Sequence, residues 1–269
     1  MTISYQKTSS QYVPSLVTRE ALLVKLFLNK YIFDKKTYIL ILISFLPLLT
    51  TGNLLFPDFE DYINLIGSSS IFSFIIMPLI TLILGVSAIA DEKENKTISQ
   101  LLSRPVTREE IVIAKWITVM LIGLVIVILD SLILYIGFII VVPESTGLLG
   151  HSLELIGVWI YLGLWFSVYA TIFLFLGIWI DKNAFGLGLA IAYFEAFFSQ
   201  FIFGSMMTGN SAFSISNHIN YVASEYLLPN YIDFIIIDFD PFISLLICLG
   251  LIFGFLLLGC FLMRKKDFP

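Results

Sequence analysis

The chain has 269 residues, of which 58% are apolar and only 13% are charged, and its mean hydropathy is +0.96. An ordinary soluble domain is far less apolar, so this composition predicts an integral membrane protein. The net charge is −5, and the sequence shows no basic patch that would lie on a soluble surface, so we expect no nucleic-acid partner.

We expect a single membrane domain, 1–269, that opens with a cytoplasmic lead-in, 1–36. This lead-in carries six basic residues and has no short apolar core ending at a cleavage site, so we expect no removable signal. Residues 15–33 can form an amphipathic helix with a narrow polar strip of Thr18, Lys25 and Asn29. Long basic side chains on such a helix can reach back to water while its apolar face enters the headgroup region. The pattern therefore favours an interfacial helix, and a plain cytosolic lead-in is the alternative.

Lysine and arginine are absent from three long stretches, 37–90, 116–181 and 183–263. A bilayer core takes roughly 20 apolar residues per helix, so each stretch can hold two helices and a loop. Pro47 and Pro78 are expected to kink the first two helices, which membrane proteins tolerate. The sequence therefore predicts an all-α membrane domain, 37–263, with six spans near 37–56, 66–90, 111–142, 155–180, 185–203 and 242–263.

The orientation of these spans follows from the rule that cytoplasmic loops carry the lysines and arginines. With six spans, all 15 basic residues fall on one side of the membrane. The loops on the other side, 57–65, 143–154 and 204–241, contain none and carry acidic residues instead. We therefore expect a multi-pass protein of the cell membrane with both termini, including the tail 264–269, in the cytoplasm.

The cytoplasmic loop between the second and third spans, 91–110, contains two helix-start patterns. Thr97 precedes Gln100 by three residues, and Thr107 precedes Glu110 by the same spacing. This spacing is the capping box, in which each side chain satisfies a backbone N–H of the other residue. The loop is therefore predicted to hold one short helix before the third span begins.

The short helix predicted in this loop has an apolar ridge. Ile98, Leu101 and Leu102 fall on one side of it, and Pro105 ends it because proline cannot continue a helix. The pattern favours a small rigid helix lying across the cytoplasmic ends of the second and third spans. An ordinary solvated loop with charges is the alternative.

The longest loop, 204–241, is too apolar for a disordered segment. We expect it to pack, either as a lid or short interfacial helices over the outer mouth or as a simple packed loop. The two histidines of the chain, His151 and His218, are far apart in sequence and give no reason to expect a metal site.

Two acidic residues are predicted to lie well inside the membrane, Asp130 in the third span and Glu195 in the fifth. Ionisable groups at that depth are costly and usually face the bundle interior or a wet cavity. We hypothesise that they line a translocation route or pair across it. The alternative for each is a protonated acid that makes one hydrogen bond between helices.

Residues 91–115 resemble the intracellular loop of the ABC-2 type permeases, the transmembrane subunits of one class of ABC transporter. That loop has an acidic residue and a threonine, a leucine pair, a Ser-x-Pro-Val-Ser/Thr-Arg run and a lysine that enters the third helix. This chain departs from it at Lys96 and Ala114, where the family usually has glycine. The match covers about one tenth of the chain and consists of Glu92, Thr97, Leu101, Leu102, Ser103, Pro105, Val106, Thr107, Arg108, Glu109 and Lys115.

The resemblance implies an ATP-driven exporter built from two permease copies, a homodimer, and two nucleotide-binding ATPase subunits. The loop helix would then be a coupling helix seated on the ATPase. Because this chain has no G-x-x-x-x-G-K-[ST] motif, ATP and Mg²⁺ are expected on the separate ATPase subunit, and no cofactor or catalytic residue is expected here. The implied coupling residues are Glu92, Thr97, Ile98, Leu101, Leu102, Pro105, Arg108 and Lys115.

Two other classes of function remain as alternatives. A six-helix secondary transporter or channel would need no ATPase, but the hydropathy shows no inverted repeat and no matching pair of broken spans. An intramembrane metalloprotease is suggested only by the pair Glu109 and Glu110. No histidine falls in a predicted span to complete a zinc site, so an enzyme is not expected.

Overall fold

The computed structural model describes residues 15–44, 76–95, 97, 106–141, 152–180, 183–197, 215–227 and 240–266. Every regular element in these ranges is helical, as the sequence predicts. The elements are α1 (Leu16–Ile32), α2 (Lys35–Ser44), α5 (Met77–Glu94), α7 (Arg108–Val141), α8 (Ser152–Trp179), α9 (Ala184–Phe197), α11 (Ile215–Val222), a π-helical segment (Ala223–Leu227) and α12 (Pro241–Lys265).

Three helices in the described ranges are long and apolar enough to cross a bilayer: Arg108–Ile133, Leu155–Trp179 and Pro241–Lys265. They correspond to the third, fourth and sixth predicted spans. A shorter apolar helix, Ala184–Phe194, lies within the predicted fifth span. The first two spans are described only in part, by α2 and α5, so the count of six stays a prediction.

The helix boundaries on the two sides of the loop 96–105 differ from those of the predicted spans. Helix α5 continues to Glu94, beyond the expected end at residue 90, and α7 begins at Arg108, before the expected start at 111. These additional turns carry charged side chains that make ion pairs and caps, so they remain helical outside the apolar stretch.

Proline and aspartate mark the beginnings of two helices. Pro78, which the sequence predicts to kink the second span, lies in the first turn of α5, where proline is well tolerated. Pro241 similarly opens α12, and Asp240 Oδ1 accepts a hydrogen bond from the Phe242 N–H at 2.8 Å. An aspartate cap followed by proline fixes this helix start. Pro47 lies outside the described residues.

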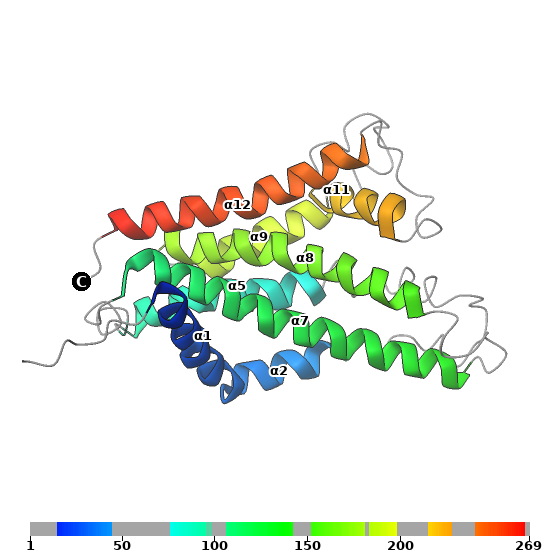
Figure 1. Cartoon of the computed structure of the whole chain (residues 1–269), viewed down its shortest axis with the longest axis horizontal. Helices are drawn as coiled ribbons and strands as arrows, with labels where there is room; N and C mark the ends of the chain where they lie inside the picture. The colour runs from blue at the N-terminus through cyan, green and yellow to red at the C-terminus, as the bar shows by residue number, and fades with distance from the viewer. Residues whose placement is uncertain are drawn as a thin grey trace, which may run out of the picture.

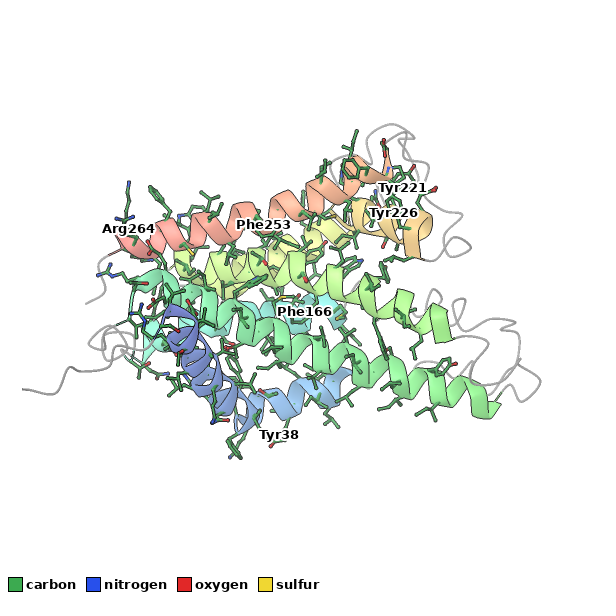
Figure 2. The ribbon with its side chains drawn as sticks, in the orientation of Figure 1. Tyr38, Phe166, Tyr221, Tyr226, Phe253 and Arg264 are labelled. Carbon is green, nitrogen blue, oxygen red and sulfur yellow. The ribbon has the colours of Figure 1, made fainter. Side chains whose placement is uncertain are left out.

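Helix α8 lies at the centre of the bundle and packs against α5, α7 and α12. Its inward side chains Trp165, Phe166, Tyr169 and Phe173 are almost completely buried. The rings of Trp165 and Tyr169 stack with their centroids 4.6 Å apart. Figure 1 shows α7, α8 and α12 running along the long axis with α1 inclined across one end. Figure 2 places Phe166 in the middle of this arrangement.

Within the segment 204–241 the structure describes residues 215–227, which are helical, and residues 240–241, where α12 begins. Asn220 of α11 accepts a hydrogen bond from the Tyr161 hydroxyl of α8 at 2.7 Å. His218 Nδ1 of α11 lies 3.0 Å from Ser244 Oγ of α12. Helix α11 is therefore packed between these two helices, at the end of the bundle opposite to α1 (Figure 1). For residues 215–227 this favours short helices over a simple packed loop, whereas their place over an outer mouth stays a prediction.

Two glycines allow α5 and α8 to approach closely. A Cβ atom on Gly85 of α5 would lie 2.8 Å from Phe173 Cβ and 3.0 Å from the Ala170 carbonyl oxygen of α8. A Cβ atom on Gly177 of α8 would lie 2.8 Å from the Val86 carbonyl oxygen of α5. Because the obstructing atoms are mostly backbone, they cannot move aside without separating the two helices. This contact places the end of α5, where the candidate site lies, against α8.

We predict that Gly85→Ala lowers the melting temperature of the detergent-purified protein. Overpacking should cost about 1–3 kcal/mol, more than the gain in helix propensity of about 1 kcal/mol. Gly163→Ala on α8 is the matched control, because its added Cβ meets nothing within 4 Å. The control should melt at the wild-type temperature or slightly above it. If both variants melted alike, the close approach of α5 and α8 would be refuted.

Candidate functional site

The candidate site lies where α5 ends and α7 begins, on either side of the loop 96–105. Of the coupling residues that the sequence implies, the structure describes Glu92, Thr97, Arg108 and Lys115. Ile98, Leu101, Leu102 and Pro105 lie outside the described residues, so the short coupling helix itself stays a prediction.

An ion pair between Glu92 and Lys115 joins the two helices that flank the loop. Lys115 Nζ lies 2.5 Å from Glu92 Oε1, and the two side chains are only 1% and 3% exposed. Removing two charges from water costs several kcal/mol per ion, which only a close and hydrogen-bonded partner offsets. Each of these charges therefore holds the other in place, and α5 is tied to α7.

Helix α1 completes the surroundings of this ion pair. Lys30 Nζ lies 3.3 Å from the same Glu92 oxygen, and its side chain is 56% exposed. The ring of Phe27 lies under the Lys115 ammonium, 4.2 Å from nitrogen to centroid. An aromatic face attracts a cation, most strongly where water is excluded. The pair is thus enclosed by α1, α5 and α7 together.

Thr107 and Thr97, the threonines of the two predicted capping boxes, form different kinds of hydrogen bonds in the structure. Thr107 and Glu110 form the predicted box: the Thr107 N–H donates to Glu110 Oε2 at 2.9 Å, and the Glu110 N–H donates to Thr107 Oγ1 at 3.2 Å. Thr97 instead donates from its N–H to the Glu92 carbonyl at 3.0 Å, at the end of α5. Its predicted partner Gln100 lies outside the described residues. The second capping box is therefore confirmed, while the first box stays a prediction.

Helix α1 packs against the beginning of α7 rather than standing apart. Leu23 and Phe27 form a small buried cluster with Ile111 and Ala114 of α7. The three polar-strip residues of α1 all face outward: Thr18, Lys25 and Asn29. One part of the apolar face of α1 is thus used for packing, which the sequence did not indicate. Its placement at a membrane interface stays a prediction.

A second cluster of charges fixes α1 on α7. Arg19 Nη2 of α1 lies 3.2 Å from Glu110 Oε1, so the carboxylate that caps α7 also binds α1. Glu20 lies beside this pair. Burial raises the pKa of the Glu20 carboxyl, the negative charge of Glu110 raises it further, and Arg19 opposes both effects. The cluster is therefore sensitive to the charge on Glu20.

The two acids predicted to lie inside the membrane are on α7 and α9. Asp130 is buried in α7 with 3% of its surface exposed. The neighbouring Ser131 Oγ accepts a hydrogen bond from the Trp159 indole N–H of α8 at 2.6 Å. Glu195 belongs to α9, but its side chain lies outside what the structure describes. A shared translocation route therefore stays a prediction.

Several residues of the site could not be found from the sequence. Lys30 and Phe27 reach Glu92 and Lys115 from a helix more than sixty positions away. Lys93 Nζ donates hydrogen bonds to carbonyl oxygens at the end of α8, although the loop pattern gives this lysine no role. For Lys30 and Lys93 the sequence contained only an indirect signal, because all lysines and arginines were predicted to lie on the same side of the membrane.

Comparison with known proteins identifies the family. A family model described as "ABC-2 family transporter protein" matches residues 2–268. Comparison with curated proteins gave no match. The family match spans nearly the whole chain, whereas the resemblance seen in the sequence rested on the loop 91–115 alone.

Breaking the buried ion pair should destabilise the protein strongly. Lys115→Met leaves the Glu92 carboxylate buried, with the exposed Lys30 as its remaining ionic partner, and should cost about 3–5 kcal/mol. The matched control Lys30→Met removes an exposed partner and should cost only about 0–1 kcal/mol. Melting temperatures in detergent measure both, and the double variant Glu92→Gln/Lys115→Met should recover much of the loss. Equal melting of Lys115→Met and wild type would contradict the ion pair.

Glu20→Gln should stabilise the protein at neutral pH. The folded state holds a proton on Glu20 more tightly than the unfolded state, so the cost of the ionised form is absent below the ordinary pKa of 4.5 and grows as pH rises above it. The variant should therefore melt higher than wild type at neutral pH, and this gain should shrink as the pH falls. Glu94→Gln removes an exposed charge near the end of α5 and should change little. A gain that did not vary with pH would refute the role given to Glu20.

Proposed function

Because the chain belongs to the ABC-2 transporter family, we propose that it is the membrane-spanning permease subunit of an ATP-driven exporter. Permeases of this family normally work with an ATPase subunit. We propose that this chain binds its separate ATPase through the cytoplasmic loop between α5 and α7 and hydrolyses no ATP itself.

The observation that carries this proposal is the buried Glu92–Lys115 ion pair. It joins the last turn of α5 to an early turn of α7, on the two sides of the loop. A short segment held at both ends by one fixed contact moves as a rigid body with the helices that hold it. A loop of this kind can transmit the movement of a soluble subunit to the helices that hold it. A loosely attached loop would change its own conformation instead.

The charges around the loop support a cytoplasmic position. Basic side chains from α1, α7 and α12 and Lys93 of α5 lie at one end of the bundle, where α12 also ends (Figure 1). Lysine and arginine concentrate on the cytoplasmic side of membrane proteins. We therefore propose cytoplasmic termini, a location in the cell membrane, and a homodimer of permeases that presents two such loops to two ATPase subunits.

The proposal predicts that an ATPase purifies with the wild-type chain in mild detergent and is lost when the loop is changed. Leu101→Ser/Leu102→Ser should lower the recovery of the ATPase at least about tenfold, since contacts at the centre of an interface can each contribute 2 kcal/mol or more. The recovery is measured by quantitative mass spectrometry of the affinity-purified chain.

The matched control carries the same two substitutions on the other predicted side of the membrane, Leu148→Ser/Leu149→Ser. It should retain the ATPase at the wild-type level, and both variants should reach the membrane in equal amounts. If the wild-type chain purified without an ATPase and still transported its substrate, a secondary transporter or channel would replace the proposed function.

A further inference from the structure

Two basic residues next to the ends of the loop reach across to other helices. Lys93, in the last turn of α5, donates from Nζ to the carbonyl oxygens of Gly177 at 2.8 Å and Ile178 at 2.6 Å, at the end of α8. It also lies 3.4 Å from the Ile180 carbonyl. The last four carbonyls of a helix have no partner within it and carry partial negative charge, so a lysine there is favourable.

Arg108, the first residue of α7, makes the corresponding contact with α12. Its Nη1 donates to the carbonyl oxygens of Met263 at 3.4 Å, Arg264 at 3.3 Å and Lys266. These oxygens also belong to the end of a helix. The residues on the two sides of the loop thus hold two different helices, α8 through Lys93 and α12 through Arg108.

The two held helices are also joined to each other. Lys266, directly after α12, donates from Nζ to the Ile178 carbonyl at 3.0 Å and the Trp179 carbonyl at 3.2 Å. At the opposite end of the bundle, α11 bonds to α8 through Asn220 and to α12 through His218. A displacement of the α8 and α12 ends would therefore be shared between these helices and passed along them to α11.

We propose that Lys93 and Arg108 are positioning residues that transmit the movement of the ATPase-bound loop to α8 and α12. This inference rests on the proposed function, because it needs an ATPase that drives the loop. Arginine suits the role at α12, since its planar group presents several donors in a fixed geometry. A simpler role, stabilising two helix ends, would affect folding without affecting the link between ATP hydrolysis and the permease.

The test uses the complex of the full chain with its copurified ATPase, reconstituted in lipid nanodiscs. The measured quantity is the ratio of kcat for ATP hydrolysis by the complex to kcat of the ATPase alone, together with KM for ATP. In the wild type this ratio should differ from one by about fivefold or more, the lower end of typical coupling between sites. Arg108→Gln and Lys93→Gln should bring the ratio close to one with KM unchanged.

Matched controls distinguish a loss of transmission from the effect of removing a positive charge and from the effect of unfolding. Arg264→Gln removes an arginine whose side chain is 77% exposed and whose ion pair with Glu109 is long, 3.9 Å, and it should keep the wild-type ratio. Figure 2 shows this side chain pointing away from the bundle. Arg108→Lys keeps one donor and should restore part of the effect. All variants should retain the ATPase and melt near the wild-type temperature when the ratio is compared.

The outcomes are distinct for the two proposals. If no ATPase accompanies the wild-type chain, the proposed function itself fails. If the ATPase binds and the wild-type ratio persists in Arg108→Gln and Lys93→Gln, the transmission role is overturned while the proposed function stands. If the kcat ratio fell toward one in Arg264→Gln as far as in Arg108→Gln, the transmission role would also be overturned, because the loss of a positive charge alone would then explain the effect.

Discussion

The contact on which this structure depends is a buried pair of opposite charges on α5 and α7, close to the ends of these helices that flank the loop 96–105. Glu92 and Lys115 are both nearly inaccessible, and each would be very costly to bury without the other. Phe27 and Lys30 of α1 close over them, so the pair also helps to hold the first helix in place. Together with the other polar contacts between helices, this pair fixes the arrangement of α1, α5 and α7 at the end of the bundle next to the loop 96–105.

The basic residues at this end have more than one physical task. Their one-sided distribution along the sequence predicts the orientation of the chain in the membrane. In the folded protein, Lys93, Arg108 and Lys266 also donate to carbonyl groups at the ends of α8 and α12. Helix ends need such donors because their last carbonyls have no internal partner. The residues whose distribution predicts the orientation therefore also join the helices, which is the basis for the transmission that we propose.

The sequence predicted the local features of the site but not the way in which they meet. The capping box of Thr107 and Glu110 needs only neighbouring residues, and it was found as expected. Glu92 and Lys115 belonged to the recognised loop pattern, yet nothing in that pattern indicated that they form a buried pair. The roles of Phe27 and Gly85 depend on contacts between helices distant in sequence, which hydropathy and spacing do not encode. The same holds for α11, whose polar residues His218 and Asn220 face inward because α8 and α12 supply their partners.

The most direct test of the account is to ask what touches the loop in the intact membrane. A photoreactive amino acid replaces Gln100 in the loop, or Gly147 on the other predicted side, and irradiated membranes are analysed by mass spectrometry. The account predicts that the probe at position 100 forms an adduct with a nucleotide-binding subunit and that the probe at position 147 does not. An adduct with that subunit from position 147 alone, or adducts with lipid only from position 100, would contradict a cytoplasmic loop that binds an ATPase.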